Sequence, residues 1–452
     1  MKNFKISRRF ASGSLARSFS ELYLNNDDPL AKSRGNIMFG NMFAIAWSII
    51  TTGVFFVGFL QANGASDTMI GTVNMTMIAC GLLQLFSPLI LERFKKRKRY
   101  LLAMRGIYGF IYFVIVSALP LLPFSREMLL ALITTLIILS AIIQNGLMGS
   151  GYSTWHIQSV PEKTRINFFS FSFMANTAVN IICMVSAGAF LDNMTLHGFE
   201  MYAFLALRLV AFVLILLEMF FYGRSVELPY ADKLQRVRLK ALFLVPMKHK
   251  PFLLMMSIMM FWSFLANLAG TYYLSYLLQD LGQSYRLISL SSAVGTAVML
   301  LSTPMWNKII RKTSWLSALI IALPTYAVVF AGFGFVFREN IWLYVVCVIG
   351  NTIIAPAINL VAMNLPFMHT PKENQTMFLS MFTTGNAIAA FAGVSIGNFL
   401  MIITQNMSYE FLGMVFGNKQ TMCFLQAFLM IIMMFGVIKI KNVLSGHPAQ
   451  NS

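Results

Sequence analysis

The sequence predicts an all-α polytopic membrane protein whose twelve transmembrane helices form two pseudo-symmetric six-helix bundles. Three observations support this prediction: twelve long apolar segments, a one-sided distribution of Lys and Arg, and a pattern that recurs in both halves of the chain. The composition agrees, because 58% of the 452 residues are hydrophobic and only 11% are charged. Soluble globular proteins carry about 25% charged residues, so an ordinary soluble protein of this length is excluded.

The twelve apolar segments are each long enough to cross a bilayer, which takes about 20 residues in a helix. They are too long and too continuously apolar to be strands of a membrane β-barrel. Because a bilayer requires every backbone N–H and C=O group to be hydrogen-bonded within the protein, the segments are expected to be α-helices. The predicted spans are 37–62, 69–91, 101–123, 127–151, 168–191, 201–222, 251–279, 284–306, 315–337, 341–366, 376–403 and 417–440.

The basic residues lie almost entirely on one side of these spans. Of the 34 Lys and Arg, 28 fall in or directly beside the two tails and alternate connections, and only Arg126, Arg286, Arg338 and Lys419 lie in or directly beside the other connections. Because Lys and Arg collect in cytoplasmic loops, both termini are expected in the cytoplasm. The net charge of +18 then reflects orientation and attraction to anionic lipid headgroups, not nucleic-acid binding.

The polar segments divide the chain into five parts. We expect a basic cytoplasmic N-terminal tail (1–36), a first six-helix bundle (37–222), a cytoplasmic central linker (223–250), a second bundle (251–440) and a cytoplasmic C-terminal tail (441–452). Matching dipeptides relate the two bundles: Trp47-Ser48 recurs as Trp262-Ser263, 215 residues later. Matches near that offset also link Glu92 to Asn307 and Pro161 to Pro371, which indicates a parallel duplication.

The connection after the second span carries the stretch Glu92-Arg93-Phe94-Lys95-Lys96-Arg97. It resembles the loop motif of the major facilitator superfamily in its acid, its Arg and its two following basic positions, although Pro88 and Lys95 replace the two glycines. The resemblance implies two bundles around a central cavity that alternates between inward-open and outward-open states. It also implies an integral inner (plasma) membrane protein of bacterial origin.

Charged residues of this loop are the expected gating group. The resemblance suggests that Glu92 and its neighbours hold one bundle against the other and release when the cavity opens inward. The gating candidates are Glu92, Arg93, Lys96, Arg97 and Arg105. For Arg105, about one turn into the third span, snorkelling to the interface is an equally good interpretation.

Polar side chains within the spans are the expected substrate contacts. Several lie four residues apart on one helix face, and those on spans one, four, five and seven would face the cavity that the family resemblance implies. A cavity of amides and aromatic rings with few charges suits a neutral polar solute such as a sugar or glycoside. The candidates are Trp47, Thr51, Gln144, Asn145, Asn176, Asn180, Trp262, Asn267, Tyr273, Asn351 and Asn386. For a single Ser or Thr, helix–helix adhesion is the stronger explanation.

Few titratable groups lie within the spans, which bears on ion coupling. Apart from Glu127, the first residue of the fourth span, Glu218 is the only carboxylate inside a span, and Arg208 lies within the same span. Both are candidates for coupling transport to H⁺ or Na⁺, although Arg208 could also anchor the helix at the interface.

Other functional classes find little support in the sequence. The four cysteines form no CxxC pair and the five histidines show no ligand spacing, so we expect no metal, cofactor or enzymatic site. The prediction is a secondary transporter that moves a small solute by alternating access. A multidrug or metabolite efflux antiporter and a non-transporting sensor with the same fold remain alternatives.

Overall fold

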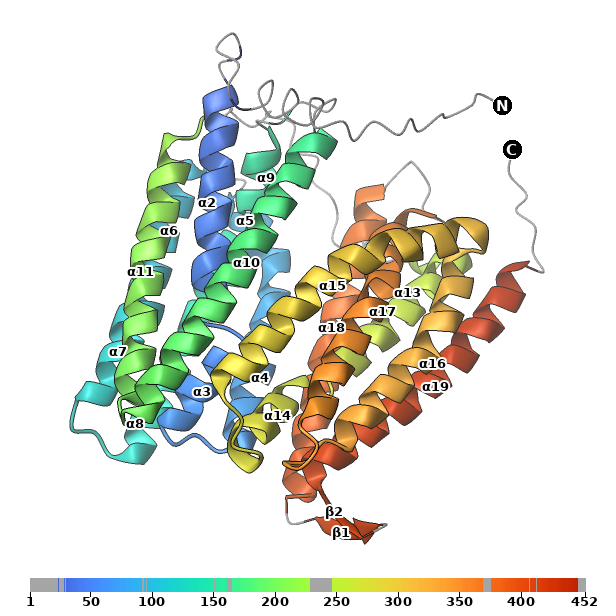
Figure 1. The fold of residues 1–452 in the computed structure, drawn as a ribbon. Coiled ribbons are helices and arrows are strands. Elements are labelled where there is room, and N and C mark those ends of the chain that lie inside the picture. The colour runs from blue at the N-terminus through green and yellow to red at the C-terminus, as the bar shows by residue number, and fades with distance from the viewer. Residues whose placement is uncertain are drawn as a thin grey trace.

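The computed structural model is built almost entirely of helices (Figure 1). It describes residues 30–91, 93–94, 96–149, 151–158, 160, 165–227, 246–368, 375–405, 407–411 and 413–445, together with Tyr23 and Asp28. Each of the twelve predicted apolar segments coincides with one helix or with a series of consecutive helices. The predicted all-α membrane fold is therefore confirmed. Most of the expected N-terminal tail, residues 228–245 of the linker and residues 446–452 lie outside the described residues.

Six spans make up the first bundle, and several of them consist of more than one helix. The first comprises α2 (Ala31–Ile49) and α3 (Val54–Ala62), and the second comprises α4 (Asp67–Gly81), a 3₁₀ turn (Leu82–Phe86) and α5 (Ser87–Leu91). The third span comprises α6 (Lys98–Gly109), a π-helical turn (Phe110–Ile115), α7 (Val116–Ala118) and a 3₁₀ turn (Leu119–Leu121). The fourth comprises α8 (Arg126–Ile142), a π-helical turn (Ile143–Met148) and α9 (Gly151–Gln158). The fifth and sixth are the single helices α10 (Arg165–Leu196) and α11 (Glu200–Arg224).

The second bundle follows the same plan, and five of its spans are single helices. Its first span comprises α13 (Lys250–Ala266), α14 (Gly270–Ser275) and the π-helical turn Tyr276–Asp280. The remaining spans are α15 (Tyr285–Lys312), α16 (Trp315–Gly334), α17 (Trp342–Met368), α18 (Gln375–Ile403) and α19 (Asn418–Ser445). Between the last two lies an antiparallel hairpin of β1 (Ser408–Phe411) and β2 (Met414–Gly417), in which Tyr409 pairs with Phe416.

Span length agrees with membrane insertion. Nine helices in the described part of the chain are long and apolar enough to cross a membrane, and α2 with α3 makes a tenth despite a 44° bend. The two remaining predicted spans are divided into shorter helices, at α4–α5 and at α13–α14.

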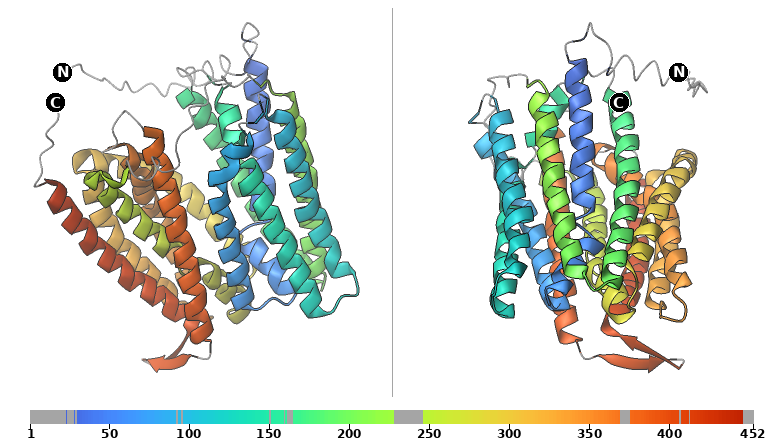
Figure 2. Two further views of the ribbon diagram at one scale, coloured as in Figure 1. Left: turned by 180° about the vertical axis from the view of Figure 1, so that it is seen from behind. Right: turned by 60° about the vertical axis from the view of Figure 1, so that its left-hand side comes forward.

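Within the described residues, the two bundles approach each other most closely toward one end of the molecule. The first helix begins and the last helix ends at the same end of the molecule, which we call the termini end; the opposite end is the distal end (Figures 1 and 2). Toward the distal end the bundles converge, with α10 against α15 and α4 against α18, and toward the termini end their helices diverge.

Hydrophobic packing follows this asymmetry. One cluster fills the first bundle and continues into the second through Tyr276, Leu277, Tyr285 and Ile288, all of which lie near the distal end. A separate cluster around Met430, Leu323 and other buried residues fills the second bundle. A shared core therefore joins the bundles distally.

Candidate functional site

The first and seventh spans break at corresponding positions. Helix α2 ends at Ile49 and α3 begins at Val54, whereas α13 ends at Ala266 and α14 begins at Gly270. Thr52 in the first break and Asn267 in the second are 215 residues apart, the same offset that separates Trp47 from Trp262. The two breaks therefore belong to the internal repeat. Paired interruptions of this kind mark the substrate site in many transporters.

Local chemistry explains both breaks. Gly53 has φ 60° and ψ −128°, a conformation that is essentially restricted to glycine. Just before it, the hydroxyls of Thr51 and Thr52 donate to the carbonyls of Trp47 (2.7 Å) and Ser48 (2.8 Å). Asn267 acts in the same way in the second bundle, where its Nδ2 donates to the Ser263 carbonyl at 2.8 Å. Side chains thus bond backbone carbonyls where each helix ends.

A pocket of about 330 Å³ lies between the two breaks, and we call it the inter-bundle pocket. Each bundle contributes four of its lining residues: Gly53, Phe56, Val57 and Asn74 from the first, and Ala266, Asn267, Gly270 and Leu274 from the second. The site thus depends on both halves of the chain.

A second pocket, of about 120 Å³, lies within the first bundle, and we call it the N-bundle pocket. It adjoins the first break, because Thr52 lines it and the next residue, Gly53, lines the inter-bundle pocket. No charged side chain occurs among the described residues that line either pocket. The N-bundle pocket is lined by Trp47, Ser48, Thr51, Thr52, Met77, Tyr108, Tyr112, Ile137, Ser140, Ala141, Gln144 and Asn145.

Several predicted substrate contacts carry buried polar atoms that bond nothing in the described part of the structure. These atoms are the amide oxygens of Gln144, Asn176, Asn180 and Asn386 and the hydroxyl of Tyr273. Nearly all buried polar atoms in proteins are hydrogen-bonded, and the exceptions often mark the place of a water or a ligand. Among them, Gln144 lines the N-bundle pocket, so its amide oxygen is placed to accept a hydrogen bond from a solute there.

The predicted substrate contacts separate into two groups. Trp47, Thr51, Gln144 and Asn145 line the N-bundle pocket, and Asn267 lines the inter-bundle pocket. The others line neither. Trp262 packs against Tyr326 with tilted rings whose centres are 5.2 Å apart, and Tyr273 packs against Tyr276, Phe333 and Tyr344 in the second bundle. Asn176, Asn180, Asn351 and Asn386 are half-buried on α10, α17 and α18.

A buried ion pair lies directly behind the N-bundle pocket. Arg105 donates from Nε (3.0 Å) and Nη2 (2.8 Å) to Oε1 of Glu218, and Trp47 Nε1 donates to Oε2 of the same carboxylate at 2.6 Å. Glu218 is fully buried and Arg105 is 8% exposed. Arg105 was expected among the gating cations, but it neither snorkels to the interface nor joins the loop after the second span. A buried guanidinium needs an opposite charge, and Glu218 provides it.

Arg208 occupies a different part of the first bundle. Its Nε donates to Ser117 Oγ at 2.8 Å, Nη2 donates to the Tyr112 carbonyl, and its guanidinium lies 4.3 Å from the centre of the Phe59 ring. Only 2% of the residue is exposed, so it is not an interfacial anchor. It lines neither pocket.

The gating loop contacts its own bundle in this structure. Glu227, just past α11, accepts from the backbone N–H of Arg97 and from that of Lys98 at 3.0 Å. Arg93 and Lys96 are exposed. Glu92 lies outside the described residues, so its expected role stays a prediction.

The distal contacts between bundles were not anticipated from the sequence. Lys419 Nζ lies 2.5 Å from Asp67 Oδ2, across the bundle boundary, and 2.6 Å from Asp280 Oδ2. Ser275 donates to Asp67 and accepts from Gln61 Nε2 at 2.9 Å. The available signal was Lys419 itself, one of only four cations on the sparsely charged side.

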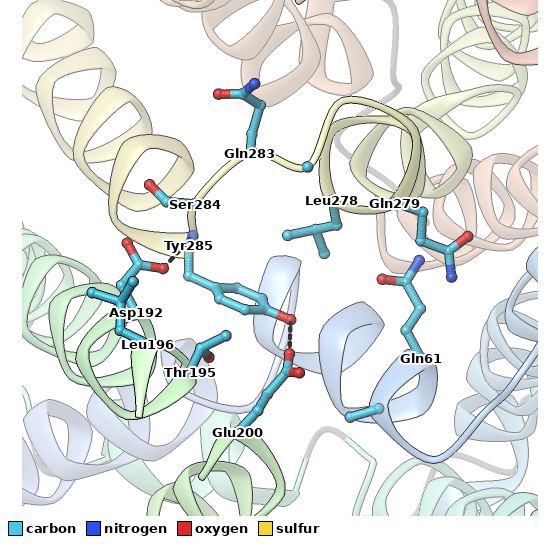
Figure 3. Close-up of a pocket in the computed structure, with 12 residues that line it drawn as sticks. Gln61, Asp192, Thr195, Leu196, Glu200, Leu278, Gln279, Gln283, Ser284 and Tyr285 are labelled. Carbon is cyan, nitrogen blue, oxygen red and sulfur yellow. Dashed lines mark hydrogen bonds between the residues drawn. The ribbon is translucent and has the colours of Figure 1, made fainter. Parts of the chain in front are cut away.

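A second group of distal contacts surrounds Tyr285 (Figure 3). Asp192 of α10 accepts from the first backbone N–H groups of α15, those of Tyr285 (2.7 Å) and Arg286 (2.8 Å). Glu200 of α11 accepts from the Tyr285 hydroxyl at 3.0 Å. Asp192, Glu200 and Tyr285 border a pocket of about 580 Å³, the distal pocket, which Gln61, Gln279 and Gln283 also line. Acidic residues of the first bundle thus bind the N-terminus of a second-bundle helix.

The architecture defines a polytopic helical membrane protein with two repeated bundles that share a central pocket. A family model described as Major Facilitator Superfamily matches residues 38–394. The chain belongs to the major facilitator superfamily and is a multi-pass membrane transporter of that family, as the loop motif and the repeat suggested.

Solved structures of low sequence identity share this fold. The nucleoside transporter NupG aligns with a TM-score of 0.67 and 11% identity over 90% of this chain and 98% of its own. A bacterial homologue of the iron transporter ferroportin, in an inward-facing state, aligns with a TM-score of 0.67 and 14% identity over 91% and 99%. A bacterial homologue of the iron transporter ferroportin in an outward-facing state aligns with a TM-score of 0.57 and 13% identity over 91% of this chain and 98% of its own. No curated protein matches the sequence.

Proposed function

We propose that this transporter moves a small neutral polar solute, such as a sugar or glycoside, by alternating access. The observation that carries the proposal is the inter-bundle pocket, which takes four lining residues from each bundle and has no charged lining among the described residues. A solute bound there would touch both halves, so its binding would respond to their relative position.

The chemistry of the pockets favours a neutral solute. An ionic substrate would need an oppositely charged partner at this depth, because burying an unpaired charge is costly. The opposite charges of Arg105 and Glu218 neutralise each other, and the pair lies behind Trp47. Amide oxygens at Gln144 and the rings of Trp47 and Tyr108 suit a solute that combines hydroxyl donors with a ring.

The two ends of the molecule support an inward-facing assignment. The bundles are tied distally by ion pairs and a shared core, and their helices diverge at the termini end. The higher TM-score against the inward-facing ferroportin homologue is in line with this. With the termini in the cytoplasm, as the distribution of Lys and Arg predicts, the joined distal ends would face the outside and the diverging ends would face the cytoplasm.

Coupling to H⁺ or Na⁺ through Glu218 or Arg208 stays part of the proposal. Both Glu218 oxygens are occupied, so proton uptake there would require Arg105 or Trp47 to release it. A proton gradient applied to proteoliposomes, with and without a sodium gradient, separates the two ions.

Purified protein in proteoliposomes, assayed with radiolabelled sugars, glycosides, nucleosides and amino acids, tests the proposal. We expect saturable transport of a neutral solute, and Asn267→Ala or Gln144→Ala should raise its KM by about tenfold or more. Ser257→Ala and Thr135→Ala are matched controls, because each removes an exposed hydroxyl bonded only within its own helix. Transport limited to charged solutes would contradict the proposal. Binding without transport would support the sensor alternative, and the direction of net movement distinguishes uptake from efflux.

A further inference from the structure

Three side chains from three different helices meet at the back of the N-bundle pocket. Trp47 comes from α2, Arg105 from α6 and Glu218 from α11. Glu218 holds the indole N–H at 2.6 Å, and the guanidinium carbon of Arg105 lies 4.8 Å from the centre of the indole ring. The indole is therefore held at its N–H edge by one member of the ion pair and at its ring by the other.

Stability alone does not account for this ion pair. Apolar side chains of similar volume commonly replace a buried pair without loss of stability, because desolvation cancels much of the attraction. The pair instead fixes the orientation of the Glu218 carboxylate. Arg105 donates two hydrogen bonds to one of its oxygens, and the other oxygen points at the indole N–H of Trp47. Phe113 and Tyr108 pack around the same indole, with ring centres 5.6 and 5.9 Å away.

The corresponding tryptophan of the second bundle has different surroundings. Trp262 packs against Tyr326 with tilted rings and lines neither central pocket. No carboxylate hydrogen-bonds Trp262 within the described part of the chain. The repeat therefore contains two tryptophans at one structural position, and only Trp47 both lines a pocket and is anchored by charge.

We propose that Arg105 and Glu218 are positioning residues that fix the orientation of Trp47, so that its indole ring stacks on the ring of a neutral solute in the N-bundle pocket. This proposal rests on the proposed function. The pocket volume of about 120 Å³ admits a single ring, and the adjoining inter-bundle pocket leaves room for the rest of the solute. Recognition is then asymmetric: the first bundle binds the ring, and Asn267 of the second contacts the remainder.

The decisive variant is the double replacement Arg105→Met/Glu218→Leu, which removes both charges together. We expect it to keep the melting temperature of the wild type and to raise the KM for p-nitrophenyl β-glucoside, a neutral aryl glycoside, by about tenfold or more in equilibrium exchange, which needs no coupling ion. Trp47→Leu should give the same KM effect. Trp47→Phe, which keeps a ring but needs no acceptor, should retain most of the affinity. A double variant with wild-type KM would overturn the proposal, as would one in which KM rises only together with a loss of folding.

A second measurement does not depend on the substrate. In protein labelled with 5-fluorotryptophan, the ¹⁹F resonance of position 47, assigned through Trp47→Phe, should move or broaden in the double variant. That of position 262 should stay in place. In Glu218→Gln, which keeps an acceptor oxygen, the resonance should remain nearer its wild-type position. An unchanged Trp47 resonance in the double variant would refute positioning. If the wild type transports no neutral solute while the resonance shifts as expected, the proposed function fails and the positioning role stands.

Discussion

The ammonium group of Lys419 lies 2.5 Å from the carboxylate of Asp67, and this contact ties the twelfth span to the second across the distal boundary between the bundles. Lys419 is only 8% exposed, and Asp280 shares it from its own bundle. The distal end must lose this contact before the bundles can separate there.

Replacing Lys419 by Met should therefore favour the state that is open at the distal end. The substitution leaves Asp67 and Asp280 close together without their cation, at a cost of about 2 kcal/mol, or roughly a thirtyfold change in the population ratio. Spin labels at His197→Cys and Glu339→Cys, in a background without native cysteines, report the distal distance. Arg338→Met is the matched control, since Arg338 also contacts Asp280 but only its carbonyl, within the second bundle. Equal distance distributions in both variants would refute the locking role.

Gly188 permits the close approach of α10 to α15. A Cβ at this position would lie 2.6 Å from Ser289 Oγ and 2.9 Å from the Tyr285 carbonyl oxygen, and a backbone atom cannot turn aside as a flexible side chain can. Gly188→Val should therefore hold the bundles apart distally. We expect faster labelling of Ala62→Cys, on the wall of the distal pocket, by an impermeant maleimide. Gly436→Val, where a Cβ would meet nothing within 4 Å, should leave the labelling rate unchanged.

The break in the first span depends on the backbone of Gly53 and not on space around it. No atom lies within 4 Å of a Cβ placed there, but φ is 60°, so Gly53→Ala should cost about 1–3 kcal/mol through backbone strain alone. We expect a lower melting temperature together with weaker solute binding. Gly270→Ala is the matched control, because it lines the same pocket, has equal space and lacks the positive φ. Similar melting temperatures for the two variants would show that the break does not require glycine.

The pair formed by Asp28 and Arg34 gives a pH-dependent contribution at the termini end. A hydrogen bond from the Arg34 guanidinium, aided by the Leu30 N–H, lowers the pKa of the Asp28 carboxyl. Because the folded state favours the ionised form, this stabilisation is complete above the ordinary carboxyl pKa and disappears as the pH falls through the lowered value. Asp28→Asn should lower the melting temperature by about 1–3 °C at neutral pH. The difference should vanish at strongly acidic pH; Glu127→Gln controls for a general charge effect.

Periodicity and charge predicted the helices well, because a bilayer imposes length and apolarity on every span. They did not predict the breaks within spans, since Thr51, Thr52 and Gly53 are also tolerated inside membrane helices and only the backbone conformation of Gly53 shows the interruption. Trp47 and Gln144, predicted as substrate contacts, do line the N-bundle pocket, and their contact with a solute stays a prediction. The distal contacts were not, because Asp67 and Lys419 are 352 positions apart and nothing in their local sequence indicates that they meet.

Helix α3 belongs to the first bundle by sequence, yet it packs against α14 and α15 of the second as well as against α11 of its own. It is joined to α2 only through the broken backbone at residues 50–53. When the bundles separate at the distal end, α3 must therefore either lose its contacts with α14 and α15 or keep them while the chain bends further at Gly53. The boundary between the moving parts therefore need not coincide with the boundary between the two halves of the repeat, because this nine-residue helix can move with either bundle.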